Sequence, residues 1–223
     1  MWRIVWIAAF AVAMGDLESA RDRQDRAVLE RGASELARAA AEKPKDAGAE
    51  YRAALADSYV AEVAIEMRDK ARAASAAEEG IRAAQQAVAL EPRNAEYHRI
   101  LGTLCGQVIP ANTLLAFKYG GCARDEVNKA VELDANSARA YVSRGVGNYY
   151  LPAAMGGGVD KAIADFQKAI QLDPKSAEAW LWMGIALRKA NRNGEAHNAL
   201  AKSLELNPNR VWTRQQLEKT PPK

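Results

Sequence analysis

The sequence predicts an all-α protein built as a solenoid of stacked helix hairpins. In residues 177–208, apolar and small side chains recur every three or four residues on both sides of a polar break at residues 191–194, which is the spacing of two amphipathic helices. Pro208 ends the second helix, because proline has no N–H to donate and clashes with the preceding turn. Two helices this short cannot bury their apolar faces alone, so we expect them to stack on copies of the same hairpin.

Three earlier stretches repeat this arrangement. Each has apolar or aromatic side chains along one face of a first helix, followed by a second helix. The first helices are expected to begin at Ala49, Ala95 and Ala138, and the second helices to end near Pro92, Asp134 and Pro174. We expect extra residues between the two helices of each copy, including residues 108–112, 117–121 and 151–158. Insertions at one place in successive copies would project from one edge of the solenoid, often the functional edge.

The hairpin at residues 177–208 resembles the tetratricopeptide repeat (TPR). Its side chains fall on the family's aromatic, Leu-Gly, large, Ala, aromatic, Ala and Pro positions: Trp180, Met183–Gly184, Leu187, Ala196, Leu200, Ser203 and Pro208. The resemblance implies a right-handed α-solenoid of about four irregular TPR hairpins. The motifs at residues 79–81, 98–102 and 152–163 are similar to those of a group of exported bacterial TPR proteins. Residues 98–133 are also similar, more weakly, to the TPR-like domain of the regulator of microtubule dynamics family.

The N-terminal end of the chain reads as a secretory signal, residues 1–15. One early Arg is followed by an apolar run from Ile4 to Met14, with small residues at Ala11, Ala13 and Gly15. A helix of that length reaches about 16 Å, too short for a membrane core of about 30 Å, so no integral span is expected. An uncleaved anchor or a buried first helix is the alternative. With a cleaved signal, the protein would be exported to the bacterial periplasm.

The remainder of the chain divides into three parts. Residues 16–48 are expected to form one N-terminal capping helix that ends at Pro44. Residues 49–210 are expected to form the TPR solenoid, and residues 211–223 a C-terminal capping helix and tail. The formal net charge of +3 is far from the basic surface of a nucleic-acid-binding protein, so no nucleic acid partner is expected. The sequence does not indicate an oligomeric state.

No pattern of residues indicates an enzyme, a metal or a cofactor. Residues 156–158 are three glycines, but no strand precedes them and no P-loop Lys follows, so we interpret them as a turn before a helix capped by Asp160. His98 and His197 lie far apart without the clustered spacing of metal ligands, and structural roles are expected for both. Cys105 and Cys122 are either two small buried hydrophobic residues or, in an exported protein, a disulfide across one hairpin. We predict the disulfide.

The TPR resemblance also implies where a partner would bind. In that family, defined positions of each first helix line a concave groove, and on this chain they include Arg99, Arg139, Val142, Tyr149, Tyr150 and Arg188. Aromatic and Arg side chains are common anchors of interfaces, so we expect a peptide or protein segment with apolar and acidic residues. The simpler interpretation of Tyr149 and Tyr150 is that they cover the insertion at Pro152. The favoured function is a non-enzymatic binding scaffold. The alternatives are a solute- or lipid-binding accessory protein of the cell envelope and a hydrolase at the insertion edge.

Overall fold

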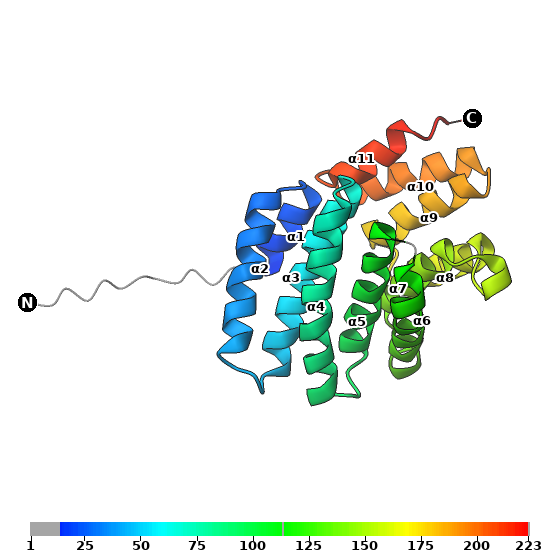
Figure 1. The fold of residues 1–223 in the computed structure, drawn as a ribbon. Coiled ribbons are helices and arrows are strands. Elements are labelled where there is room, and N and C mark those ends of the chain that lie inside the picture. The colour runs from blue at the N-terminus through cyan, green and yellow to red at the C-terminus, as the bar shows by residue number, and fades with distance from the viewer. Residues whose placement is uncertain (1–13, 113, 223) are drawn as a thin grey trace, which may run out of the picture.

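The structure is a computed structural model that describes residues 14–112 and 114–222 (Figure 1). In these ranges the chain forms α-helices joined by short turns and two 3₁₀ helices, with no strand. The predicted all-α solenoid is confirmed. The signal predicted at residues 1–15 falls almost entirely on residues 1–13, which lie outside the described residues. None of the described helices combines the length and apolar composition that a membrane crossing requires.

The N-terminal cap is two helices, where the sequence predicted one. Helix α1 spans Met14–Asp22 and helix α2 spans Arg26–Ala41. The chain reverses between them because Gln24 adopts a left-handed backbone (φ 55°) and the Asp25 side chain caps α2 by accepting a hydrogen bond from the Val28 N–H at 3.2 Å. Leu17 of α1 is then fully buried against Gly32, a packing that a straight helix would not allow.

Four helix hairpins follow the cap, as expected. They are α3 (Ala47–Glu66) with α4 (Lys70–Leu90), α5 (Ala95–Val108) with α6 (Leu115–Leu133), α7 (Ala138–Tyr150) with α8 (Val159–Leu172), and α9 (Ala177–Lys189) with α10 (Asn193–Leu206). The first helices contact each other in order, α3 to α5 to α7 to α9. We call the surface they share, which carries Glu62, Glu96, Arg139 and Trp182, the inner face. The predicted C-terminal helix is α11 (Val211–Glu218).

The two helices of a hairpin cross closely at glycine. A Cβ atom added to Gly102 would lie 2.8 Å from Val127, and one added to Gly145 would lie 2.5 Å from Phe166. These positions therefore accept no larger side chain without a shift of the facing helix. Behind the crossings, Phe166 and Leu104 are fully buried in the two main clusters of the hydrophobic core.

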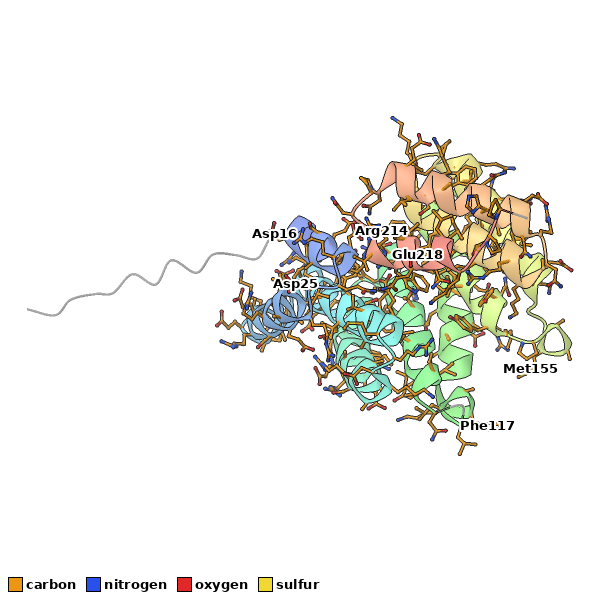
Figure 2. The ribbon with its side chains drawn as sticks, turned by 90° about the horizontal axis from the view of Figure 1, so that it is seen from above. Asp16, Asp25, Phe117, Met155, Arg214 and Glu218 are labelled. Carbon is orange, nitrogen blue, oxygen red and sulfur yellow. A yellow bond between two sulfur atoms is a disulfide. The ribbon has the colours of Figure 1, made fainter. Side chains whose placement is uncertain are left out.

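Two insertions separate the helices of a hairpin. One contains the 3₁₀ helix η1 (Ile109–Ala111), and the other, residues 151–158, contains η2 (Ala153–Met155). Gly156 and Gly158 have φ values of 90° and 113°, so the glycines form a turn, as predicted. Figure 2 shows Phe117 and Met155, which follow η1 and end η2, on the same side of the molecule, and they are 91% and 67% exposed.

Three details of the insertions differ from expectation. In the first hairpin the extra residues lengthen α3 and α4 themselves, because their apolar pattern continues to Val63 and resumes by Ala73. Residues 117–121 lie inside α6, so they are no loop. The N-cap of α8 is Gly158, while Asp160 lies in the first turn.

A disulfide joins the two helices of the second hairpin. Cys105 of α5 and Cys122 of α6 are bonded, with their Cα atoms 6.0 Å apart. The prediction of this bond is confirmed. The disulfide fixes α6 to α5 on both sides of the η1 insertion, because Cys105 precedes η1 and Cys122 lies in α6.

Candidate functional site

Arg99 is buried within the inner face. Its guanidinium donates two hydrogen bonds of 2.7 Å to the carboxylate of Glu96, one turn earlier on α5, and a third of 3.3 Å to Ser143 Oγ on α7. Only 7% of the residue is exposed. Because its donors are used inside the protein, Arg99 supports the site and leaves contact with a partner to its neighbours.

Arg139, by contrast, is open to solvent. Its Nη2 lies 3.3 Å from Glu96 Oε1, yet 60% of its side chain is exposed. Burial opposes ionisation of Glu96, but Arg99, Arg139 and a hydrogen bond from the Tyr51 hydroxyl more than offset it and lower the pKa of Glu96 to about 2. Glu96 is therefore ionised at neutral pH, and it orients Arg139 along the inner face.

Four aromatic rings gather where α7, α9 and α11 meet. Tyr149 and Tyr150 pack edge to face with ring centroids 4.9 Å apart, Trp182 lies 6.0 Å from Tyr149 and 6.3 Å from Tyr150, and Trp212 lies 5.3 Å from Trp182. We call these four residues the aromatic cluster. Tyr150 is 60% exposed, so the cluster presents an apolar surface to solvent. Such rings bury large areas at little entropic cost, which suits a binding surface.

The groove positions predicted from the sequence include two of the four residues in the aromatic cluster, Tyr149 and Tyr150. They do not include Trp182 or Trp212. Trp182 stands four residues after Glu178 and donates its indole N–H to that carboxylate at 3.0 Å. This spacing is visible in the sequence and would have placed Trp182 on the same helix face as Glu178. Trp212 lies in α11, and its position depends on how that helix folds back.

Arg188 points toward α11. Its Nη1 donates to the Gln216 carbonyl at 3.1 Å and to Thr220 Oγ1 at 2.7 Å, and its Nη2 donates to Gln216 Oε1 at 2.6 Å. The structure thus separates the predicted groove residues into two groups. Arg139, Tyr149 and Tyr150, with partly buried Val142 beside them on α7, remain accessible, whereas Arg99 and Arg188 are engaged within the protein.

The two ends of the solenoid meet at Arg210, the residue before α11. Its Nη2 lies 2.6 Å from Glu62 and also contacts Glu66, both on α3. Its Nε lies 3.7 Å from Asp22 of α1 and 3.8 Å from Glu178 of α9. Figure 1 shows α11 returning to the ends of α1 and α3, which lie far away in the sequence. A stack of hairpins is therefore closed by contacts between its first and last elements.

The histidines have the structural roles expected of them. The ring of His98 is held between Glu126 Oε2 of α6 at 2.5 Å and the Pro92 carbonyl at 2.9 Å, and His197 Nδ1 lies 2.9 Å from the Thr220 carbonyl. Within the described residues no three His, Cys, Asp or Glu side chains converge in a way that would hold a metal ion.

Comparisons with known proteins agree with this architecture. Residues 16–154, more than half of the chain, match the family model described as Regulator of microtubule dynamics protein 1-3. The chain belongs to this family. Residues 157–216 match the tetratricopeptide repeat model, so the resemblance to both families is confirmed over a wider range than the motifs indicated. The Arg210 contacts join the two matched parts, because Asp22, Glu62 and Glu66 lie in the first and Glu178 and Arg210 in the second.

Individual relatives of this family member are distant. The small glutamine-rich tetratricopeptide repeat-containing protein 2 of Mycosarcoma maydis is 32% identical over 97 residues, which cover 44% of this chain and 26% of that protein. The chain thus spans about a quarter of the length of that curated relative. A thermophilic TPR protein of Thermus thermophilus has a similar fold, with a TM-score of 0.63 and 20% identity over 93% of this chain and 95% of that one. The HusA haemophore of Porphyromonas gingivalis has a TM-score of 0.59 and 18% identity over 81% and 96%.

Proposed function

We propose that this chain is a non-enzymatic scaffold that binds a peptide or protein segment on its inner face. Its TPR architecture supports this general role, since such solenoids present an extended surface built from successive first helices. The observation that carries the proposal is the aromatic cluster on α7, α9 and α11, with Tyr150 60% exposed beside the open guanidinium of Arg139 on α7. Tyr150 is exposed and the other three rings are partly exposed, so an aromatic side chain of a partner could pack against them.

The chemistry of this surface favours a partner with both apolar and acidic residues. Val142 and Val146 lie between Arg139 and Tyr150 on α7 and are partly buried, so they form an apolar strip between a cation and the rings. Lys189 adds a second cation at the rim, with its Nζ 4.1 Å above the Tyr149 ring. A short segment with one or two carboxylates beside an aromatic or aliphatic anchor would contact all of these groups.

A peptide-display screen tests the proposal. The purified protein is presented with a library in which apolar and acidic residues vary independently, and the selected peptides are measured for binding to wild type and to Arg139→Ala/Tyr150→Ala. We expect the double variant to bind at least tenfold more weakly while its circular dichroism is unchanged. Arg124→Ala is the control, since Arg124 is equally exposed at 60% but lies on α6. If the double variant binds as wild type does, the inner face is not the site and the insertion edge becomes the better candidate.

We also propose that the protein is exported and loses its N-terminal segment, residues 1–15. The apolar run in the sequence motivates this, and the Cys105–Cys122 disulfide supports it, because such bonds persist mainly in oxidising compartments. Mass spectrometry of the protein from its native host provides the test. An intact Met1 in the cytosolic fraction would contradict export.

A second candidate function is binding of a small solute. An open hollow of about 440 Å³ lies between α8, α9 and α10, where Trp180, Met183 and Leu187 form an apolar floor. Its polar rim includes Gln167 and Asn198. Native mass spectrometry of the purified protein distinguishes the two functions, since a co-purifying small molecule would favour the solute and its absence the scaffold.

A further inference from the structure

Helix α11 is held by Arg188 of α9 and also by side chains from the opposite end of the chain. This helix has eight residues, too few to be stable alone in water. Besides Arg210, two contacts reach the N-terminal cap: Asn207 Nδ2 donates to Asp22 Oδ2 at 2.7 Å, and Gln215 Nε2 lies 3.5 Å from Gln24 Oε1. These contacts span 185 and 191 residues of sequence, so they form only when the solenoid closes.

The group that closes the solenoid carries more negative than positive charge. Among the described residues, the cations that face the carboxylates of Asp22, Glu62, Glu66 and Glu178 are the guanidinium groups of Arg21 and Arg210. The centre of the group is buried, because the side chains of Arg210 and Glu66 are each 2% exposed and that of Asp22 is 10% exposed, while those of Glu62 and Glu178 are partly buried at 22% and 29%. Burial of excess charge is costly, so such a group gains stability by retaining a proton.

Glu62 is the carboxyl best placed to hold that proton. Burial raises the pKa of Glu62 from 4.5 to about 7, and Glu178 and Glu66 add to the effect, although Arg21 and Arg210 oppose it. Burial also raises the pKa of Glu66. From α7, Arg139 faces the neighbouring Tyr59 but is paired with Glu96.

We propose that Arg210 and the four carboxylates hold the two ends of the solenoid together, and that this closure tightens as the pH falls from 8 to 6. We call these five residues the latch: Asp22, Glu62, Glu66, Glu178 and Arg210. When α11 is released, Glu62 becomes solvated and ionises near its ordinary pKa of 4.5. Between pH 4.5 and 7 the closed state therefore binds more protons than the open state, and linkage makes closure weaker as the pH rises through this range.

Closure also completes the aromatic cluster. Trp212 is two residues from Arg210, and the Arg210 guanidinium lies 5.6 Å from the Trp212 ring. Release of the latch would withdraw Trp212 from Trp182, so partner binding would weaken at high pH. This consequence rests on the proposed function, but the latch itself does not, because it is a property of the protein without a partner.

Hydrogen exchange of the α11 amides in the full-length protein, without peptide, tests the latch. After correction for the pH dependence of chemical exchange, we expect the protection of α11 to be about tenfold lower at pH 8 than at pH 6, the change that linkage gives for a pKa moving from 4.5 to about 7. Arg210→Gln should lower the protection at both pH values, leaving only what the Arg188 contacts provide. Glu62→Gln should reduce the pH difference to less than about threefold, because the neutral amide stays uncharged.

Arg214→Gln is the matched control, because Arg214 is an exposed arginine on α11 that donates to the Pro208 carbonyl and not to the latch. It should behave as wild type does. Equal protection of wild-type α11 at pH 6 and 8, or a wild-type pH response in Glu62→Gln, would overturn the proposal, and so would unchanged protection in Arg210→Gln. If Arg210→Gln does not fold, Glu62→Gln alone decides. None of these readouts changes if the peptide-binding proposal fails.

Discussion

Asp57 of α3 lies directly against Gly80 of α4, where a Cβ on the glycine would come within 2.9 Å of the Asp57 Cβ. The close approach of the two helices leaves the residue only 5% exposed. Burial raises the pKa of Asp57 to about 7, and Glu79 adds to the effect, although Arg72 and Arg82 oppose it. This acidic residue at a helix crossing therefore keeps its proton in the folded protein up to about pH 7.

This carboxyl makes folding stability depend on pH. Between pH 3.8 and 7 the folded state holds a proton that the unfolded state releases, so stability falls as the pH rises through that range. We expect Asp57→Asn to be more stable than wild type at pH 8, by about 3 kcal/mol, and nearly equal to it at pH 4.5. Urea unfolding at the two pH values measures this. Asp125→Asn, at an exposed position on α6, is the control and should show no such difference.

Two helical glycines should respond oppositely to the same substitution. A Cβ on Gly184 would lie 2.6 Å from Leu200 and 3.0 Å from the Ala196 carbonyl, whereas one on Gly120 meets nothing within 4 Å. We expect Gly184→Ala to destabilise the protein by about 1–3 kcal/mol through overpacking. Gly120→Ala should stabilise it by up to about 1 kcal/mol, because alanine is the better helix former. Thermal unfolding compares the two variants. Equal melting temperatures would show that the α9–α10 crossing accommodates an alanine side chain without overpacking.

The hairpins could be predicted because their cause is local. Apolar residues at helical spacing, small residues at crossings such as Gly102 and Gly184, and prolines after second helices are all visible in the sequence. The break at Gln24 was not predicted, because no glycine or proline marks it and a non-glycine residue supplies the positive φ. The start of α4 at Lys70 was also missed, since an Ala-rich segment fits a helix and a loop boundary equally well until its packing partner is known.

The site was predicted less completely than the fold. The family positions correctly placed Arg139 and Tyr150 on an accessible surface, because both are set by the register of one helix. The family positions could not show that Arg188 donates hydrogen bonds to Gln216, or that Arg210 forms ion pairs with α3. Both facts depend on the closure of the whole solenoid, a relationship between segments more than 140 residues apart for Arg210 and Glu62.

The disulfide should contribute measurably to stability. It closes a loop with a sequence separation of 17 residues, for which the chain-entropy model gives about 3 kcal/mol. We expect the free energy of unfolding of Cys105→Ala/Cys122→Ala, measured in urea, to be lower than that of wild type by roughly this amount. Wild type treated with a reductant should show the same decrease. Thiol titration of denatured, unreduced protein should find no free thiol. Two free thiols would contradict the bond.

Salt should separate the two components of peptide binding. Arg139 is exposed, so its attraction for an acidic peptide is screened as the ionic strength rises, whereas burial of apolar surface on Tyr150 is not. We expect wild-type affinity for an acidic, apolar peptide to fall between about 0.05 and 0.5 M salt and then to level off. Titration calorimetry at several salt concentrations measures this.

The two single variants should respond differently to the same titration. Arg139→Ala should bind more weakly at low salt and show little further change as salt is added, because the screened interaction is already absent. Tyr150→Ala should lose about 2 kcal/mol or more at every salt concentration and keep the wild-type slope, because the ring acts as an apolar anchor. Arg124→Ala should match wild type throughout. If Arg139→Ala retains the full salt dependence, the acidic residues of the peptide contact another cation, and Lys189 at the rim of the aromatic cluster is the next one to replace.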